Sequence, residues 1–233
     1  MEEILRSGLA ELRLEAPDGA VAAMCAYGAL LLEKNEITNL TAIRDPEGVA
    51  QMHFLDCAAL LKPVDFAGRR VLDIGSGAGF PGVPLKILCP TTDLTMVDSV
   101  GKKMDFVREA CAAVGVAAEC RWGRIEEMPE LRESFDIAVS RAVAELDVLA
   151  ELCLPQVKPG GLFIAMKGPD CADEVGRSDF AIRTMGGRVR EIVHYTIPGT
   201  DVTHAAVIVE KRKPTPPQYP RRYAQIKKKP LRG

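Results

Sequence analysis

The first 64 residues show hydrophobic positions at helical spacing. Leu5, Leu9 and Leu12 fall on one helical face, and a longer apolar stripe runs through residues 21–32. No strand pattern occurs in this part of the chain. We therefore expect residues 1–64 to form an N-terminal helical extension.

Residues 65–210 show short apolar runs that alternate with segments of helix length. Such alternation predicts parallel strands joined by right-handed helical crossovers. The expected strands are 71–74, 93–97, 116–120, 135–140 and 162–166, and the expected helices are 83–88, 101–113 and 145–154. Two final strands, 189–197 and 202–210, are separated by a short Pro-Gly-Thr-Asp loop, which suits an antiparallel hairpin.

A mostly parallel seven-stranded sheet with an antiparallel C-terminal hairpin is typical of the class I Rossmann-like methyltransferase fold, within the α/β class. The hairpin favours this fold over a plain dinucleotide-binding fold. We therefore divide the chain into a helical extension (1–64), a core of the methyltransferase fold type (65–210) and a basic, proline-rich C-terminal tail (211–233).

Charge is distributed unevenly along the chain. The 233 residues include 30 Lys and Arg and 32 Asp and Glu, for a net charge of −2. Nine of the basic residues and one acid lie from Glu210 onward, which leaves 21 basic and 31 acidic residues, a net charge of −10, before that point. An acidic body with a basic tail suggests that the tail engages an anionic partner.

The remaining composition is typical of a cytoplasmic globular protein. No apolar run is long enough to span a membrane, and the first residues, Met1-Glu2-Glu3, lack the features of a signal peptide. We therefore expect no membrane partner. The seven cysteines lack C-x-x-C pairs, so we expect reduced thiols packed as small hydrophobic side chains.

The most distinctive segment follows the first expected strand and reads Asp-Ile-Gly-Ser-Gly-Ala-Gly-Phe-Pro-Gly over residues 73–82. Gly75, Gly77 and Gly79 permit turns with positive φ and leave room for a ligand against the backbone. Asp73 lies near the carboxyl end of the strand, the edge where open α/β sheets bind ligands. The alternative is a tight strand-to-helix turn without a ligand.

The spacing of these residues helps to identify the ligand. A nicotinamide fingerprint, G-x-G-x-x-G, would require glycine where Phe80 stands, and a Walker loop would require Gly-Lys-Ser/Thr. S-adenosylmethionine has no phosphate, its carboxylate can use backbone N–H groups at a helix N-terminus, and an acid such as Asp73 favours its cationic sulfur. We therefore expect Asp73, Gly75, Gly77 and Phe80 to contribute to an S-adenosylmethionine site.

Further positions at strand ends suit the same ligand. Asp98 ends the second strand, where a carboxylate can accept both ribose hydroxyls; the alternative is an acid that stabilises the following helix. Ile125 and Glu126 follow the third strand, where this fold closes over an adenine ring; the alternative is a solvated helix start. Arg141 ends the fourth strand and can clamp a carboxylate or phosphate, or form a structural ion pair.

The sequence shows no dedicated catalytic base or covalent nucleophile. Residues 140–143 lack the Asn/Asp-Pro-Pro-aromatic run of amino-directed nucleic-acid methyltransferases, and Cys153 falls inside an expected helix. Arg141 is not a useful base, so its role is to bind the cofactor or to orient the target. Such a site suits a target with a free lone pair, such as guanine N7, where positioning promotes the transfer.

The histidines do not indicate a metal site. His53 and Asp56 share a helical face and are expected to form a structural pair. His194 and His204 lie on opposite arms of the expected hairpin and are not spaced as ligands. We expect no metal.

The tail interleaves basic residues with tyrosines and prolines. The prolines exclude a long helix, whereas cations and tyrosines together can contact phosphates and stack on unpaired bases. The alternative is a disordered, solubilising tail. The residues expected to bind RNA are Lys102, Lys167, Arg221, Arg222, Lys227, Lys228 and Lys229.

Seven short motifs, in order along nearly the whole chain, resemble one known family. They are residues 39–44, 53–56, 73–84, 98–102, 140–142, 167–168 and 217–222, whereas the linker 170–187 matches weakly. The family is RsmG (GidB), the bacterial 16S rRNA guanine-N7 methyltransferases.

The resemblance implies a cytoplasmic class I methyltransferase that modifies a guanine in the decoding region of 16S rRNA, free or in an assembling 30S subunit. It also implies that Gly75, Phe80, Ile125, Glu126 and Arg141 bind S-adenosylmethionine; Asp98 is added from the fold.

Three other functions stay open at this stage. A small-molecule methyltransferase on the same fold would act on metabolites and would not need the tail. A non-catalytic RNA-binding protein with a vestigial cofactor loop would bind RNA without methyl transfer. A nicotinamide-dependent dehydrogenase is disfavoured by Phe80 and by the terminal hairpin.

Overall fold

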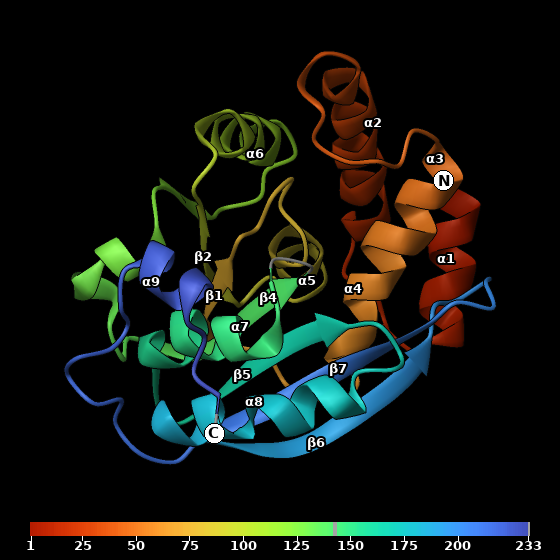
Figure 1. The fold of residues 1–233 in the computed structure, drawn as a ribbon. Helices are drawn as coiled ribbons and strands as arrows, with labels where there is room; N and C mark the ends of the chain where they lie inside the picture. The colour runs from red at the N-terminus through yellow and green to blue at the C-terminus, as the bar shows by residue number, and fades with distance from the viewer. Residues whose placement is uncertain (142–143, 233) are drawn as a thin grey trace.

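A seven-stranded sheet forms the centre of the computed structural model, which describes residues 1–141 and 144–232 (Figure 1). The strands lie in the order β3-β2-β1-β4-β5-β7-β6. Their bounds are β1 Arg70–Ile74, β2 Asp93–Asp98, β3 Glu119–Trp122, β4 Phe135–Arg141, β5 Val157–Lys167, β6 Gly187–Thr196 and β7 Thr203–Lys211. Strands β1 to β5 pair in parallel, and β7 pairs antiparallel with both β5 and β6. The expected fold class is therefore confirmed.

Nine α-helices accompany the sheet in the described part of the chain. They are α1 Glu2–Glu11, α2 Ala20–Thr38, α3 Pro46–Val49, α4 Asp56–Ala58, α5 Gly82–Leu88, α6 Gly101–Ala113, α7 Leu146–Cys153, α8 Ala172–Thr184 and α9 Tyr223–Lys228. A π-helix covers Ala50–Leu55, and short 3₁₀-helices cover Ala59–Leu61, Ile125–Glu127, Pro129–Leu131 and Leu154–Gln156.

Two hydrophobic cores lie on opposite faces of the sheet, because successive side chains of a strand point to opposite sides. Val71 packs into the core that α1, α2, α5 and α6 cover, whereas Leu72 packs into the core that α7, α8 and α9 cover. Val71 and Leu72 are both fully buried, which explains why adjacent positions of the parallel strands are apolar in the sequence.

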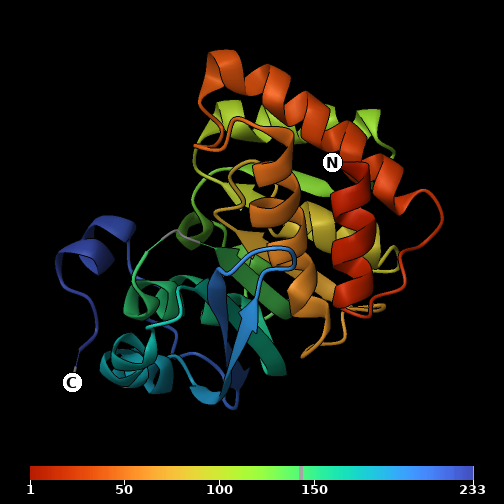
Figure 2. The same ribbon diagram turned by 90° about the vertical axis from the view of Figure 1, so that its right-hand side faces the viewer.

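The N-terminal helical extension lies against the first of these faces, where Figure 2 shows its helices in front of the sheet. The side chains of Met24, Tyr27 and Phe54 are fully buried there. The hydroxyl of Tyr27 donates a hydrogen bond to the carbonyl oxygen of Ala78 at 2.9 Å. The extension is therefore joined directly to the glycine-rich loop that follows β1.

Several expected boundaries differ from the structure. The third strand begins at Glu119 rather than at residue 116, because Gly115 adopts a positive φ of 70° and residues 116–118 form the connection. Strand β5 begins at Val157, before the Pro-Gly-Gly run, instead of at Leu162. The linker 170–187 contains helix α8, whose Ala181 and Ile182 are fully buried.

The tail is folded onto the core as far as the structure describes it, to residue 232. Lys211 is fully buried, and its ammonium group donates to the carbonyl oxygen of Leu154 at 2.6 Å and to the hydroxyl of Thr215. Arg221 forms an ion pair with the fully buried Glu151 at 2.6 Å. The structure thus contradicts the alternative of a disordered tail.

Two other expectations from composition concern membranes and thiols. Within residues 1–141 and 144–232, no helix is both long and apolar enough to cross a membrane. All seven cysteines are free, and Cys57, Cys111, Cys153 and Cys171 are buried.

Candidate functional site

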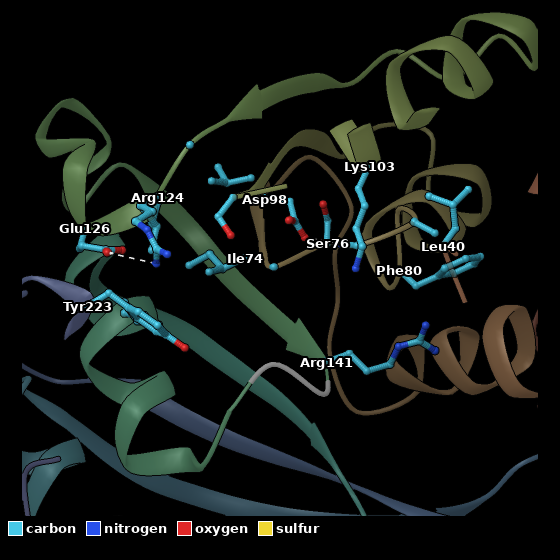
Figure 3. Close-up of a pocket in the computed structure, with 18 of the residues that line it drawn as sticks. Leu40, Ile74, Ser76, Phe80, Asp98, Lys103, Arg124, Glu126, Arg141 and Tyr223 are labelled. Carbon is cyan, nitrogen blue, oxygen red and sulfur yellow. Dashed lines mark hydrogen bonds and ion pairs between the residues drawn. The ribbon is translucent and has the colours of Figure 1, made fainter. Parts of the chain in front are cut away.

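A cavity of about 410 Å³ opens at the carboxyl ends of β1, β2 and β4 (Figure 3). This is the edge where parallel α/β sheets bind ligands. Of the residues predicted to hold a cofactor, those that line the cavity are Gly75, Gly77, Phe80, Asp98, Ile125, Glu126 and Arg141. The cavity therefore brings together residues that are spread over more than 60 positions of the sequence, and it does so where the sequence pattern predicted.

The glycine-rich loop shapes one wall of the cavity. Gly75 and Gly77 adopt positive φ values of 71° and 57°, which side chains disfavour. Apart from Gly77 itself and its two chain neighbours, no atom of the described residues lies within 4 Å of the place where a Cβ at Gly77 would be. A side chain at Gly77 would therefore fill open space at the cavity wall.

One buried oxygen atom of this loop, the hydroxyl of Ser76, fits a polar ligand. Ser76 lines the cavity, yet among the described residues its hydroxyl oxygen has no hydrogen-bond partner. A buried hydroxyl without a partner is costly, and a ligand with donors or acceptors can satisfy it. This observation supports a polar small molecule, such as a nucleoside, over the alternative of a turn without a ligand.

Asp73 lies beneath the loop with its side chain fully buried. Its Oδ2 accepts a hydrogen bond from the backbone N–H of Gly82 at 2.8 Å, whereas its Oδ1 has no partner among the described residues. Burial raises the pKa of this carboxyl group to about 7. Asp73 thus anchors the start of α5 and can supply negative charge below the loop.

Asp98 links the loop to the next strand. Its Oδ2 accepts from the N–H of Gly77 at 2.9 Å and its Oδ1 accepts from the N–H of Val100 at 2.8 Å. The second bond is of the kind expected of an acid ahead of helix α6. Asp98 also lines the cavity, and each carboxylate oxygen can accept more than one hydrogen bond, so both interpretations of this residue are compatible.

One end of the cavity lies between Ile125, Glu126 and the tail. The guanidinium of Arg124 lies 4.7 Å from the ring centroid of Tyr223 and 3.8 Å from a carboxylate oxygen of Glu126. Tyr223 belongs to α9 and lines the cavity (Figure 3). Arg124 belongs to the segment 124–127 that was expected to close over an adenine ring. Tyr223 was not predicted to line the cofactor site, because its position depends on how the tail folds back.

The other end of the cavity holds Arg141, whose guanidinium lies 5.1 Å from the ring centroid of Phe80. The imidazole of His53 stacks on the same ring, with centroids 4.5 Å apart. Thr41 and His53 bring the N-terminal extension into the cavity wall. Burial lowers the pKa of His53 to about 4, so its ring is neutral near pH 7. Lys103 joins Arg124 and Arg141 as a third cation of the lining.

His53 and Asp56 were expected to pair with each other, but they share Arg141 as their partner. Arg141 donates to Asp56 at 3.3 Å and to Nδ1 of His53 at 3.1 Å. Nδ1 of His53 also lies 3.1 Å from the carbonyl oxygen of Met52, and Nε2 lies 2.8 Å from the hydroxyl of Thr41. Arg141 thus both lines the cavity and forms the structural ion pair that was its alternative.

The residues predicted to bind RNA fall into two groups. Lys167 pairs with Glu174 at 2.6 Å, and Arg221 pairs with Glu151, so these two cations are engaged within the protein. The side chains that remain exposed are Lys102, Arg222, Lys227, Lys228 and Lys229. Ala142 and Val143, which follow Arg141 in the motif at the end of the fourth strand, lie outside the described residues.

Metal-ligating side chains do not cluster in the described residues, where no group of three or more His, Cys, Asp or Glu could hold an ion.

Comparison with known proteins identifies the family. The GidB family model, described as rRNA small subunit methyltransferase G, matches residues 20–202. The chain is 42% identical over 234 residues to ribosomal RNA small subunit methyltransferase G of Alkaliphilus metalliredigens, covering 98% of each chain. It is 41% identical over 236 residues to the protein of the same name from Pelotomaculum thermopropionicum, covering 99% of each.

Solved structures agree with the fold. A SAM dependent methyltransferase from Aquifex aeolicus superimposes with a TM-score of 0.53 at 19% identity, covering 74% of this chain and 96% of that one. The mitomycin 7-O-methyltransferase MmcR gives a TM-score of 0.58 at 14% identity, covering 79% of this chain and 60% of that one.

The glycine loop, the cavity at the sheet edge, the match over residues 20–202 and the full-length relatives all agree with the family predicted from the motifs. The chain belongs to the rRNA small subunit methyltransferase G (GidB) family.

Proposed function

We propose that this protein transfers a methyl group from S-adenosylmethionine to N7 of a guanine in the decoding region of 16S rRNA, in the cytoplasm. The observation that carries the proposal is the cavity, in which a glycine loop, an acid at the end of β2 and an arginine at the end of β4 converge. S-adenosylmethionine supplies the methyl group on a cationic sulfur, and its C–S bond breaks as the bond to N7 forms.

The two ends of the cavity suit the two ends of this cofactor (Figure 3). Ile125, Glu126 and Tyr223 would enclose the adenine, and Asp98 would accept the ribose hydroxyls. Gly75 and Gly77 would let the backbone approach the centre of the molecule. Arg141, beside Phe80, would hold the methionine carboxylate at the opposite end, because guanidinium groups bind carboxylates through paired N–H donors.

The chemistry needs no proton acceptor from the protein. Guanine N7 is a hydrogen-bond acceptor that Watson–Crick pairing leaves free. The protein then acts by positioning the two reactants in line and by surrounding the cationic sulfur with a favourable field as its charge disperses. Asp73, buried below the loop, contributes to this field when it is ionised.

The RNA would be held by exposed cations beside the cavity. Arg222 and Lys227 lie on or next to α9, the helix that also brings Tyr223 to the cavity wall. Lys102 lies at the start of α6, the helix that connects β2 to β3. Phosphate contacts by such lysines and arginines supply most of the affinity for a nucleic acid.

Incubation with labelled S-adenosylmethionine and 16S rRNA, either free or in 30S particles lacking the modification, tests the proposal. We expect label in 7-methylguanosine at one position after nucleoside mapping. Label in metabolites but not in RNA would favour a small-molecule methyltransferase, and RNA binding without methyl transfer would favour a non-catalytic RNA-binding protein. Either result would contradict the proposal.

A further inference from the structure

A buried network connects Arg141 to parts of the chain that the cavity itself does not include. At its centre is Asp56, the first residue of α4, whose side chain is 1% exposed. Its Oδ2 accepts from Arg141 at 3.3 Å. Its Oδ1 accepts from the hydroxyl of Tyr195 and from Nδ1 of His204, both at 2.9 Å. The carboxylate therefore joins the N-terminal extension, strand β4 and the β6–β7 hairpin.

Arg141 is held from several directions at once. Its Nη1 donates to the carbonyl oxygen of Met52 at 3.1 Å as well as to Asp56, and its Nη2 donates to His53 at 3.1 Å. The ring of Phe80 lies against the guanidinium. Among the described residues, Nε and the second N–H of Nη2 make no hydrogen bond, so these two donors remain available for a ligand in the cavity.

Of these three hydrogen-bond partners of Arg141 in the described residues, only Asp56 is an acid. Met52 contributes a carbonyl oxygen, and the histidine is neutral because burial lowers its pKa. A guanidinium that is only 17% exposed needs a compensating charge, and removing one partner of a buried pair is strongly unfavourable. Without the carboxylate, Arg141 would turn toward solvent or toward another acid.

The local helix geometry places this carboxylate. Residues Ala50–Leu55 form a π-helix, which widens the turn that carries Met52 and His53 and precedes Asp56. Such insertions are often found at functional sites, because they redirect side chains that a regular α-helix would place elsewhere. Here the insertion lets Met52, His53 and Asp56 face the same guanidinium.

We propose that Asp56 is a positioning residue for the cofactor site: held by Tyr195 and His204, it fixes Arg141 so that the free donors of the guanidinium meet the methionine carboxylate. The inference rests on the proposed function, because it names S-adenosylmethionine as the ligand. The proposal gives the helical extension and the β6–β7 hairpin a role in binding the methyl donor, because both position Arg141 through Asp56.

Asp56→Asn tests the proposal. Asparagine has the same size and keeps an oxygen for Tyr195 and His204, but it presents an N–H group to a guanidinium that has only donors. We expect the KM for S-adenosylmethionine and the Kd for S-adenosylhomocysteine to rise at least about tenfold, as for loss of a binding interaction. The kcat and the KM for 30S particles should stay within about threefold of wild type.

This split separates positioning from stability. A variant that merely unfolds in part would show fewer binding sites per chain in calorimetry and a lower apparent kcat, with unchanged Kd and KM. Asp136→Asn is the matched control, because it removes an ion pair with Lys158 at the opposite end of the same strand β4. We expect this control to keep the wild-type Kd.

A double-mutant cycle shows whether Asp56 acts through Arg141. In an Arg141→Ala background, Asp56→Asn should change the Kd for S-adenosylhomocysteine by less than about twofold, because coupled residues are not additive. If Asp56→Asn does not fold, Tyr195→Phe removes one hydrogen bond from the same carboxylate and should raise the Kd about threefold, a typical effect of one such bond.

An unchanged Kd for S-adenosylhomocysteine in Asp56→Asn would overturn the proposal. Where that variant does not fold, an unchanged Kd in Tyr195→Phe would do so. Equal effects of Asp56→Asn in the wild-type and Arg141→Ala backgrounds would also overturn it. These outcomes are distinct from failure of the proposed function, in which the wild-type protein itself would bind neither S-adenosylmethionine nor S-adenosylhomocysteine.

Discussion

Replacing Asp73 with asparagine should change how the stability of the protein depends on pH. The carboxyl group is fully buried, and burial raises its pKa from 3.8 to about 7. Its folded-state pKa therefore lies above its unfolded-state value. Because the folded state holds this proton more tightly than the unfolded state, the group stabilises the folded protein fully below about pH 4. This contribution to the free energy of unfolding is lost as the pH rises through about 7.

The size of this effect follows from the two pKa values. Each pKa unit corresponds to about 1.36 kcal/mol, so the shift corresponds to roughly 4 kcal/mol in total. About 2 to 3 kcal/mol of this falls between about pH 5 and pH 8. Asparagine does not titrate, and its side-chain oxygen can still accept from the N–H of Gly82. The free energy of unfolding of Asp73→Asn, relative to wild type, should therefore increase by about 2 to 3 kcal/mol over this range.

Urea unfolding of both proteins at several pH values, without cofactor, measures this difference. Parallel curves, with a difference that stays constant to within about 0.5 kcal/mol, would refute the reasoning. The same substitution should weaken S-adenosylmethionine more than S-adenosylhomocysteine, because only the former carries a positive charge for the ionised carboxylate to favour.

Two further predictions concern the tail. Tyr223→Ala should raise the Kd for S-adenosylhomocysteine by at least about fivefold, since aromatic stacking on a base contributes about 1–3 kcal/mol. Tyr223→Phe, which keeps the ring, should bind like wild type. Equal binding by the alanine variant would exclude Tyr223 as an adenine contact. Replacing Lys227 and Lys228 with glutamine should lower the magnitude of the log–log salt slope of RNA binding by about 0.7 to 0.9 for each phosphate that the variant no longer neutralises. Lys62→Gln, which changes an exposed lysine ahead of β1, should leave this slope unchanged. An unchanged slope in the double variant would exclude these lysines from the RNA interface.

Much of the fold could be predicted from the sequence because its signals are local. Strands β1 and β2 are short and mostly apolar, and they are followed by a glycine loop and closed by an acid, respectively. Helix α6 was predicted with the bounds that the structure shows. The hairpin of β6 and β7 was visible from its short Pro-Gly-containing loop. The loop residues Gly75 and Gly77 were identifiable because their conformation depends on the absence of a side chain.

The rest depends on tertiary contacts that no local pattern contains. Tyr223 reaches the cavity from a tail that long-range contacts hold against the core, among them the bond from Arg221 to Glu151, 70 residues earlier in the chain. Asp56 meets Arg141 across 85 residues, and the π-helix that makes this meeting possible has no recognised sequence signal. Helix α8 was missed because its buried face has few large apolar side chains, among polar and charged neighbours.

Calorimetric titration of S-adenosylmethionine into two glycine variants tests the central claim, that the cavity beside the β1 loop holds this donor. Gly77 and Gly115 both adopt positive φ, at 57° and 70°, with open space where a Cβ would be, but only Gly77 lines the cavity. The backbone strain of a Gly→Leu change is therefore matched between them. We predict one binding site per chain in the wild type and in Gly115→Leu, and loss of binding in Gly77→Leu. A Gly77→Leu protein that binds S-adenosylmethionine as well as the wild type does would contradict the account.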